Sequence, residues 1–211
     1  MYYTVDFTDT RDDDLYKLYQ DTPTSMKNTA FKNMERLWHQ ADFSWIYQEK
    51  CREFLLDKKN LIKISTLVDL GCGKGHALLK FSNNWGFNKI IGVELNEKYF
   101  QICKKNIKAV ENKHPNYINT QIEVKNMNAS RFVFTPDINF LYLFNPFGRK
   151  TLGKVIDNII DSLKKFPREF YVIYRNAIHL KEFLKRNFVV IHQQDDKECI
   201  ILKYTYVSLK N

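Results

Sequence analysis

The 211-residue chain has few of the residues that would mark a secreted, fibrous or membrane protein. It contains only four cysteines, seven glycines and five prolines. Because the cysteines form no Cys-x-x-Cys pair, their spacing predicts neither a metal site nor a disulfide framework, and we expect reduced thiols. No apolar run approaches the length of a membrane span, and the N-terminus is polar and acidic where a secretion signal is basic and then apolar. These absences predict a cytoplasmic protein without a membrane partner.

Basic residues outnumber acidic residues in the chain. Lysine and arginine total 33 against 24 acidic residues, which gives a formal net charge of +9. A cationic excess supplies non-specific affinity for phosphates, but there is no arginine-rich tail and no basic tract interleaved with aromatics. Lysine pairs such as Lys104-Lys105 fall at helical positions, where a solvated face is the ordinary explanation. The net charge therefore does not by itself decide between a nucleic-acid partner and a compositional bias.

The hydrophobic pattern changes character once along the chain. Hydrophobic residues make up 44% of the sequence and aromatics 15%, enough to build a proper core. Up to about residue 60 the pattern is helical and rich in aromatics, and afterwards short β-rich runs alternate with helical ones. We expect a helical cap or substrate lid over 1–60 and an α/β domain over 61–211.

The α/β part predicts a doubly wound sheet, because strands and helices alternate through its first five strands. The last two strands are joined by only five residues, 193–197, a hairpin signal. Seven strands are predicted, over 66–70, 89–94, 121–125, 138–144, 169–174, 188–192 and 198–204. Four helices are predicted, over 76–85, 97–110, 150–165 and 178–185.

A glycine-rich turn, VDLGCGKGH at 68–76, joins the first strand to the first helix. Gly71 and Gly73 allow positive φ angles and let bare backbone N–H groups approach a ligand, while the helix from His76 adds its free N-terminal amides. The dinucleotide fingerprint is Gly-x-Gly-x-x-Gly. Here the third glycine, Gly75, comes one residue early, which disfavours a pyrophosphate ligand.

The second strand ends in an acid, Glu94, about 20 residues beyond the glycine turn. A carboxylate at this place can accept hydrogen bonds from both hydroxyls of a ribose. The turn and the acid together predict one adenosine-type ligand.

The stretches VDLGCGKG, with Asp69 two residues before Gly71, and IIGVELN closely resemble the first two motifs of class I S-adenosylmethionine (SAM)-dependent methyltransferases. The resemblance covers nearly the whole chain and extends to small bacterial members with an Asn-Pro-Phe motif after the fourth strand. It implies a Rossmann-like fold with a seven-stranded, mostly parallel sheet, a C-terminal antiparallel hairpin and SAM as cofactor. The cofactor-binding residues that it implies are Asp69, Gly71, Cys72, Gly73, Gly75, Glu94, Leu95, Asn128, Ala129 and Asn145.

The third strand is followed by Asn126-Met127-Asn128-Ala129, where the family usually has an acid and a small residue that receive the adenine amino group. The amide of Asn128 could both accept from that amine and donate to a ring nitrogen. Met127 could pack on the adenine face or simply fill the core.

The fourth strand is followed by Asn145-Pro146-Phe147-Gly148. Amino-methylating members of the family carry Asn-Pro-Pro-Tyr or Asn-Pro-Pro-Phe here, in which the amide and main-chain carbonyls orient the target NH₂ and the ring stacks on the substrate. The match implies catalytic roles for Asn145, Pro146 and Phe147, although one proline is missing and the aromatic comes one residue early. The alternative is a plain turn that leaves the strand.

The loop after the fifth strand contains His179, which could take a proton from a hydroxyl acceptor because its ordinary pKa lies near neutrality. Alternatively it is a solvated residue in the first turn of a helix, for which Asn176 is the expected N-cap. His76 could lie near the carboxylate of the ligand or simply on a helix face.

Three functions remain open. The first is a SAM-dependent methyltransferase acting on an O or N atom of a small molecule or saccharide, favoured by the short aromatic cap. The second acts on RNA, DNA or a protein lysine, favoured by the net charge, by Asn-Pro-Phe and by a faint likeness to non-SET histone-lysine methyltransferases. The third is a non-catalytic nucleotide-binding protein.

Overall fold

The computed structural model describes residues 51–193 and 199–206. Residues 1–50, which make up most of the predicted cap, lie outside the described residues, as does the loop 194–198 of the predicted hairpin. Among the described residues, no helix combines the length and apolarity needed to cross a bilayer.

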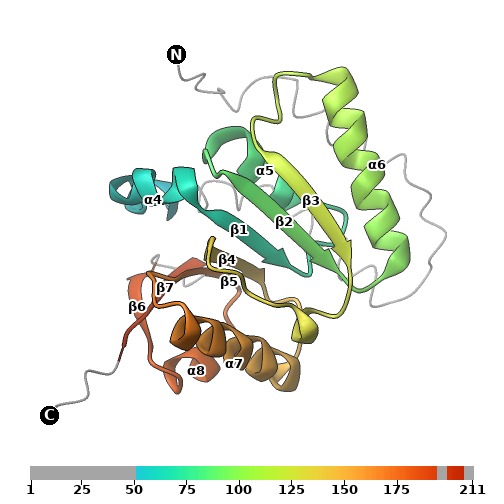
Figure 1. The fold of residues 1–211 in the computed structure, drawn as a ribbon. Helices are drawn as coiled ribbons and strands as arrows, with labels where there is room; N and C mark the ends of the chain where they lie inside the picture. Colours follow the sequence, from blue (N-terminus) through green and yellow to red (C-terminus); the bar gives the residue numbers. More distant parts are fainter. Residues whose placement is uncertain (1–50, 194–198, 207–211) are drawn as a thin grey trace, which may run out of the picture.

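The seven predicted strands are confirmed, and they form one mixed sheet (Figure 1). Its spatial order is β3-β2-β1-β4-β5-β7-β6. The first five strands pair in parallel, and β7 runs antiparallel between β5 and β6. The strands are β1 (Thr66–Leu70), β2 (Lys89–Glu94), β3 (Gln121–Asn126), β4 (Ile138–Phe144), β5 (Tyr171–Arg175), β6 (Phe188–Gln193) and β7 (Cys199–Tyr204).

The four predicted helices are present, although the one predicted over 97–110 runs on to Lys113 and the one predicted over 178–185 is shorter. The elements are the 3-10 turns η2 (Leu56–Lys58) and η3 (Ala129–Arg131) and the helices α4 (Lys59–Ile64), α5 (His76–Asn84), α6 (Glu97–Lys113), α7 (Arg149–Lys165) and α8 (Leu180–Leu184). The prediction of a helix over 178–185 was too long, because residues 176–179 form tight turns. The N–H of Ile178 donates to the Asn176 carbonyl at 2.8 Å and that of Leu180 to the Ala177 carbonyl at 3.1 Å.

The strand alternation sorts apolar side chains onto two faces of the sheet, each covered by helices. Leu67 and Ile90 point toward α5 and α6, whereas Val68 and Ile91 point toward α7 and α8. Each face carries a large buried cluster, so the sheet lies between two helical layers (Figure 1).

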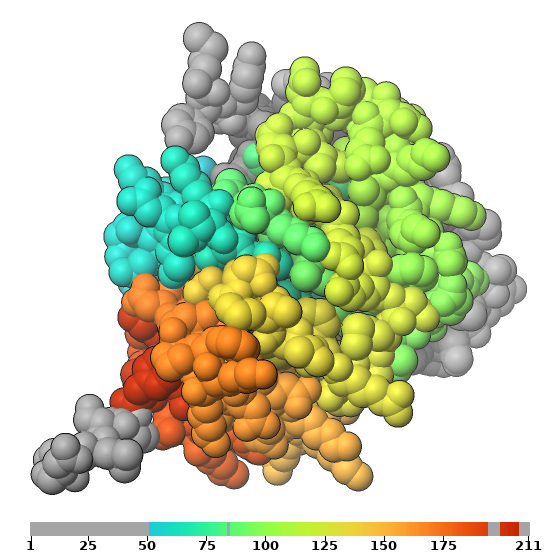
Figure 2. Space-filling view, viewed as in Figure 1, coloured from blue at the N-terminus to red at the C-terminus, as the bar shows by residue number. Residues whose placement is uncertain are grey.

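The segment 51–64 packs onto the same face as α5 and α6. Its buried residues Cys51, Leu55 and Ile62 join that cluster, and Figure 2 shows the α4 region in cyan beside the orange and red segments near the C-terminus. Because α4 spans 59–64, the predicted domain boundary at 60/61 falls inside a helix. The division into a cap and a methyltransferase domain stays a prediction.

Candidate functional site

The loops after β1 and β4 meet at the point where the sheet order reverses. From this central pair the chain builds outward to β2 and β3 on one side and to β5 on the other. Ligands of open α/β sheets bind at such a switch point, outside the carboxyl ends of the strands. This edge is therefore the candidate site.

The three glycines of the turn share a backbone conformation but differ in what surrounds them. All have positive φ, 86° at Gly71, 55° at Gly73 and 87° at Gly75. A Cβ on Gly71 would lie 2.4 Å from Pro146 Cβ, and one on Gly75 would lie 2.5 Å from Cys103 Sγ. Nothing lies within 4 Å of the corresponding point at Gly73. Gly71 and Gly75 thus allow close packing, while Gly73 leaves space at the surface of the turn.

The expectation that the turn presents bare amides was wrong at four positions. The N–H groups of Gly71 and Cys72 donate to the Val93 carbonyl at 2.7 and 3.1 Å, and that of Gly75 donates to the Cys72 carbonyl at 2.9 Å. The N–H of Gly73 donates to Glu94 Oε2 at 2.9 Å. Three of these amides are satisfied because the turn folds back onto the end of β2, and that of Gly75 is satisfied within the turn.

Glu94 is held by backbone groups on both of its carboxylate oxygens. Oε2 accepts from Gly73 N, and Oε1 accepts from Asn96 N at 2.8 Å. A carboxylate can accept about four hydrogen bonds, so each oxygen keeps capacity for one more donor. The half-buried side chain is fixed in place and can still receive a pair of hydroxyls.

Asp69 lies one strand away and is only 3% exposed. Burial, with a smaller effect from the charge of Glu94, raises the pKa of Asp69 to about 8. The carboxyl is therefore mostly protonated at neutral pH, and a cation placed beside it would favour the ionised form. The neighbouring Cys72 side chain is turned into the core, where its thiol hydrogen-bonds Cys103.

The ends of β2 and β3 are joined around Leu95. Asn126 Nδ2 donates to the carbonyls of Glu94 at 3.0 Å and Leu95 at 3.2 Å, and Met127 N donates to the Glu94 carbonyl at 3.1 Å. Leu95 itself is 66% exposed, although it is a large apolar side chain. The network therefore holds an apolar surface beside Glu94.

Asn128 has a structural role that limits its predicted one. Its Oδ1 accepts from Ser130 N at 2.9 Å and from Ser130 Oγ at 2.8 Å, which caps η3. The acceptor atom is thus already in use, and the Nδ2 donor is the part of the amide suited to a ring nitrogen. Ala129 is buried in the cluster beneath α7.

Asn145 occupies an unusual position after β4. Its φ is 43°, a left-handed conformation that asparagine tolerates better than most residues. Its Oδ1 is buried and has no hydrogen-bond partner within the described residues. A buried acceptor without a donor costs free energy, so this atom is a candidate contact for a substrate donor.

The two other residues of the predicted acceptor motif pack inward. Pro146 lies against Gly71, and Phe147 packs against the cluster on the α7 face. The exposed ring at this edge is Phe144, which is 38% exposed and has the Arg175 guanidinium 4.5 Å from its centroid. Sequence reasoning missed both residues. The alternation of side chains along β4 could have indicated Phe144. It lies on the same face of the sheet as Tyr142, but it extends beyond the end of the neighbouring strand β1.

The loop after β5 does not form the expected capped helix. Asn176 has a φ of 45°, whereas an N-cap takes an extended conformation, and the N-cap of α8 is His179. The expectation for Asn176 was therefore wrong, and the base role of His179 stays a prediction. At the glycine turn, burial and the charge of Lys80 lower the pKa of His76 to about 3, so its imidazole is neutral.

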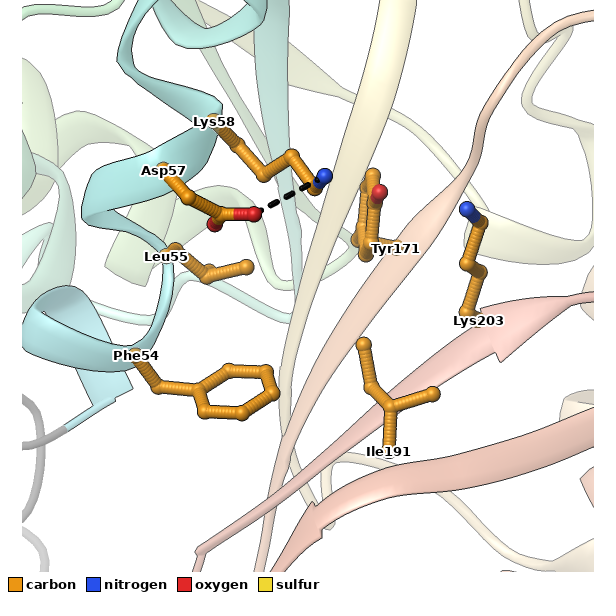
Figure 3. A pocket seen from close by; sticks show the side chains of 7 residues that line it. All are labelled: Phe54, Leu55, Asp57, Lys58, Tyr171, Ile191 and Lys203. Atoms are coloured by element: carbon orange, nitrogen blue, oxygen red, sulfur yellow. Dashed lines mark ion pairs between the residues drawn. The ribbon is translucent and has the colours of Figure 1, made fainter.

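A separate pocket of about 420 Å³ lies at the opposite edge of the sheet, near the first residue of β5 (Figure 3). Lys58 and Asp57 pair across 2.9 Å at its rim, and Lys203 pairs with Glu169. Burial and Glu169 raise the pKa of Tyr171 to about 12. The pocket is lined by Phe54, Leu55, Asp57, Lys58, Tyr171, Ile191 and Lys203.

Comparison with solved structures supports the fold. The methyltransferase domain of a bacterial CtHen1 matches with 13% identity and a TM-score of 0.52, over 75% of this chain and 99% of that one. The precorrin-6y C5,15-methyltransferase of Geobacter metallireducens matches with 14% identity and a TM-score of 0.52, over 74% and 88%. A protein of the NADB-Rossmann superfamily from Streptococcus agalactiae matches with 17% identity and a TM-score of 0.50, over 70% and 65%. At such identities these matches show the fold alone.

Comparison of the sequence with family models is more specific. No curated protein sequence matches the chain. The family model described as mycolic acid cyclopropane synthetase matches residues 7–149, which include the glycine turn, Glu94 and the loop after β4. The match covers more than half of the chain. The chain therefore belongs to the mycolic acid cyclopropane synthetase family and is a class I SAM-dependent methyltransferase.

Proposed function

We propose that the enzyme binds SAM across the carboxyl ends of β1, β2 and β3 and methylates a nitrogen or oxygen atom of a small molecule or saccharide. The observation that supports the cofactor site most strongly is the carboxylate of Glu94, which two backbone N–H groups hold beside the open surface of Gly73. Such a carboxylate matches the paired hydroxyls of a ribose.

The remaining residues of the cradle match other parts of the cofactor. The exposed side chain of Leu95 offers an apolar face to the adenine ring, and Asn128 Nδ2 offers a donor to a ring nitrogen. Asp69 is a buried carboxyl whose ionised form a cation would stabilise. Bound SAM would bring two cationic groups, its ammonium and its sulfonium, and the sulfonium supplies an activated methyl group.

The acceptor chemistry is inferred from Asn145. Its buried Oδ1 lacks a donor, so a substrate N–H or O–H would satisfy it and become oriented at the same time. An amine acceptor needs only a neutral lone pair. A hydroxyl acceptor also needs a base, for which His179 is the candidate.

Placement is the main task of the protein in this reaction. Holding a nucleophile in line with the methyl group can supply about 7 to 11 kcal/mol of the barrier. The contact between Pro146 and Gly71 joins the acceptor loop to the glycine turn, so the two reacting groups would be held by one continuous wall.

A macromolecular acceptor is the second candidate, favoured by cations next to the acceptor loop. Arg149 and Lys150 open α7 directly after Gly148, both are exposed, and no acid lies in that first turn. Glu182 neutralises Arg149 in part, at 3.4 Å. A strand of RNA or DNA or an acidic protein could contact this face. We do not retain the non-catalytic alternative, because the chain belongs to a methyltransferase family.

The acceptor proposal is tested by methyl uptake from labelled SAM. Small-molecule, saccharide and total RNA pools are incubated separately with the wild type and with Lys150→Glu. Uptake by a small-molecule or saccharide pool that Lys150→Glu leaves unchanged is the expected result. Uptake restricted to RNA, lost in Lys150→Glu and falling steeply with salt, would favour the second candidate.

A further inference from the structure

Two cysteines far apart in the sequence meet in the core. Cys51 and Cys199 are separated by 148 positions, and their sulfur atoms lie 2.8 Å apart. Both residues are 0% exposed. Sequence spacing indicated scattered thiols, and the fold brings these two into contact.

The pair links the segment that precedes η2 to the last strand that the structure describes. Cys51 lies in the helical residues 51–54 that precede η2, and Cys199 is the first residue of β7. Cys199 is in register with Arg175, the last residue of β5. The thiols therefore lie at the carboxyl end of β5, and β4 separates them from the glycine turn on β1.

We propose that Cys51 and Cys199 are a modification site, a dithiol that a hydroperoxide converts into an intramolecular disulfide. A disulfide has an S–S distance of about 2.05 Å, so the two sulfurs need to approach by roughly 0.8 Å. A shift of that size is within the reach of side-chain rotation.

The reaction balances without any further reagent. One sulfur, as the thiolate, attacks a peroxide oxygen, the O–O bond breaks, and the departing hydroxide takes up the proton that the thiol released, which gives water and a sulfenic acid. The second thiol then attacks the sulfenic sulfur as its S–O bond breaks, the S–S bond forms, and the departing hydroxide takes the proton of the second thiol and leaves as a second water. The two thiols together lose two electrons, and one peroxide molecule gains them.

Burial makes this reaction slow at neutral pH. Contact with Cys199 and burial raise the pKa of the Cys51 thiol well above its usual range, and the positive charge of Arg175 opposes this shift only in part. Because the thiolate is the reactive form, the rate of disulfide formation should rise with pH. In the described residues none of the four cysteines takes part in a disulfide.

The second buried pair, Cys72 and Cys103, provides a matched comparison. Their thiols also hydrogen-bond, but they lie under the glycine turn between β2 and α6. Joining them would strain the cradle, because Cys103 Sγ is packed against Gly75, where an added Cβ would lie only 2.5 Å from this sulfur. Oxidation at Cys51 and Cys199 leaves that cradle unchanged, and this difference separates the two pairs experimentally.

The test treats the full-length protein with hydrogen peroxide, alkylates the remaining thiols in denaturant and maps the peptides by mass spectrometry. The expected product has lost two hydrogens and joins the Cys51 peptide to the Cys199 peptide. Because the closed loop is long, the Tm should rise by on the order of 10 °C and return after reduction. Cofactor affinity should be unchanged.

Three variants separate the proposal from general oxidation. Cys199→Ser should abolish both the crosslink and the Tm rise, as should Cys51→Ser, and Cys72→Ser should keep both. A crosslink between Cys72 and Cys103 alone, intermolecular disulfides alone, or conversion of Cys51 to sulfinic acid without a crosslink would overturn the proposal. The peptide map of the wild type gives the answer even where a variant does not fold.

Discussion

Pro146 lies directly over Gly71, so that a Cβ on the glycine would be 2.4 Å from the Cβ of the proline. The glycine turn and the acceptor loop are thus in contact across β1 and β4, at the switch point of the sheet. Two motifs that are separate in the sequence form one wall of the candidate site.

This contact predicts that Gly71→Ala is far more damaging than Gly73→Ala. Both glycines have positive φ, which costs an alanine about 1 to 2 kcal/mol. Only at Gly71 does the new methyl group also meet a rigid proline ring, whereas Gly73 faces open space. Urea unfolding should show a clearly larger loss of stability for Gly71→Ala. Equal losses in the two variants would mean that the proline contact contributes little.

Glu94→Ala should weaken SAM binding at least tenfold. The change removes charge-assisted hydrogen bonds of about 1.5 to 3 kcal/mol each, and it also releases Gly73 N and Asn96 N. Glu94→Gln is the matched control, because it keeps one acceptor oxygen and should lose less affinity. Calorimetric titration measures both, and unchanged affinity in a folded Glu94→Ala protein would exclude the ribose role.

The raised pKa of Asp69 predicts that the stability of the fold depends on pH. Burial and Glu94 raise its pKa to about 8 in the folded protein, while the unfolded value is about 3.9. Its favourable contribution is therefore fully present below about pH 4 and is lost as the pH rises to about 8. Asp69→Asn removes the buried charge, so its Tm should exceed that of the wild type by several degrees at pH 8 and approach it near pH 4. A Tm difference that does not change between these pH values would contradict the shifted pKa.

Asn145→Ala should lower kcat strongly and leave SAM affinity nearly unchanged, because the lost Oδ1 would act on the acceptor as the transition state is reached. Asn145→Gly is the companion variant, since glycine accepts the φ of 43° without strain. If the residue only shapes the turn, Asn145→Gly should be fully active on the pool that shows methyl uptake. Loss of activity in both folded variants is the expected result.

The sequence predicted the sheet well because its strands are short, apolar and separated by clear turn signals. All seven were placed, and the largest difference was at β5, which starts at Tyr171 and not at residue 169. Helix α8 was predicted too long because Asn176 and its neighbours form turns whose hydrogen bonds compete with a helix. The spacing of apolar residues, from which the helix was predicted, gives no information on these turn hydrogen bonds.

The sequence identified residues of the candidate site, but it did not predict which contacts these residues make in the fold. The glycines and Glu94 could be identified because their roles depend on backbone conformation and spacing. The inward packing of Phe147, the use of Asn128 Oδ1 as a cap and the meeting of Cys51 with Cys199 depend on tertiary contacts between distant segments. The cap over residues 1–60 stays a prediction, because residues 1–50 lie outside the described part of the chain.

Thermal unfolding of the wild type with SAM, with its demethylated product and with NAD shows whether the cradle formed by the glycine turn and Glu94 binds SAM. At about 100 times the dissociation constant, a ligand of the native state adds about 2.7 kcal/mol to the free energy of unfolding. SAM and the demethylated product should each raise the Tm clearly, and NAD should leave it unchanged. A rise with NAD and no change with either SAM or its product would contradict SAM binding by this cradle.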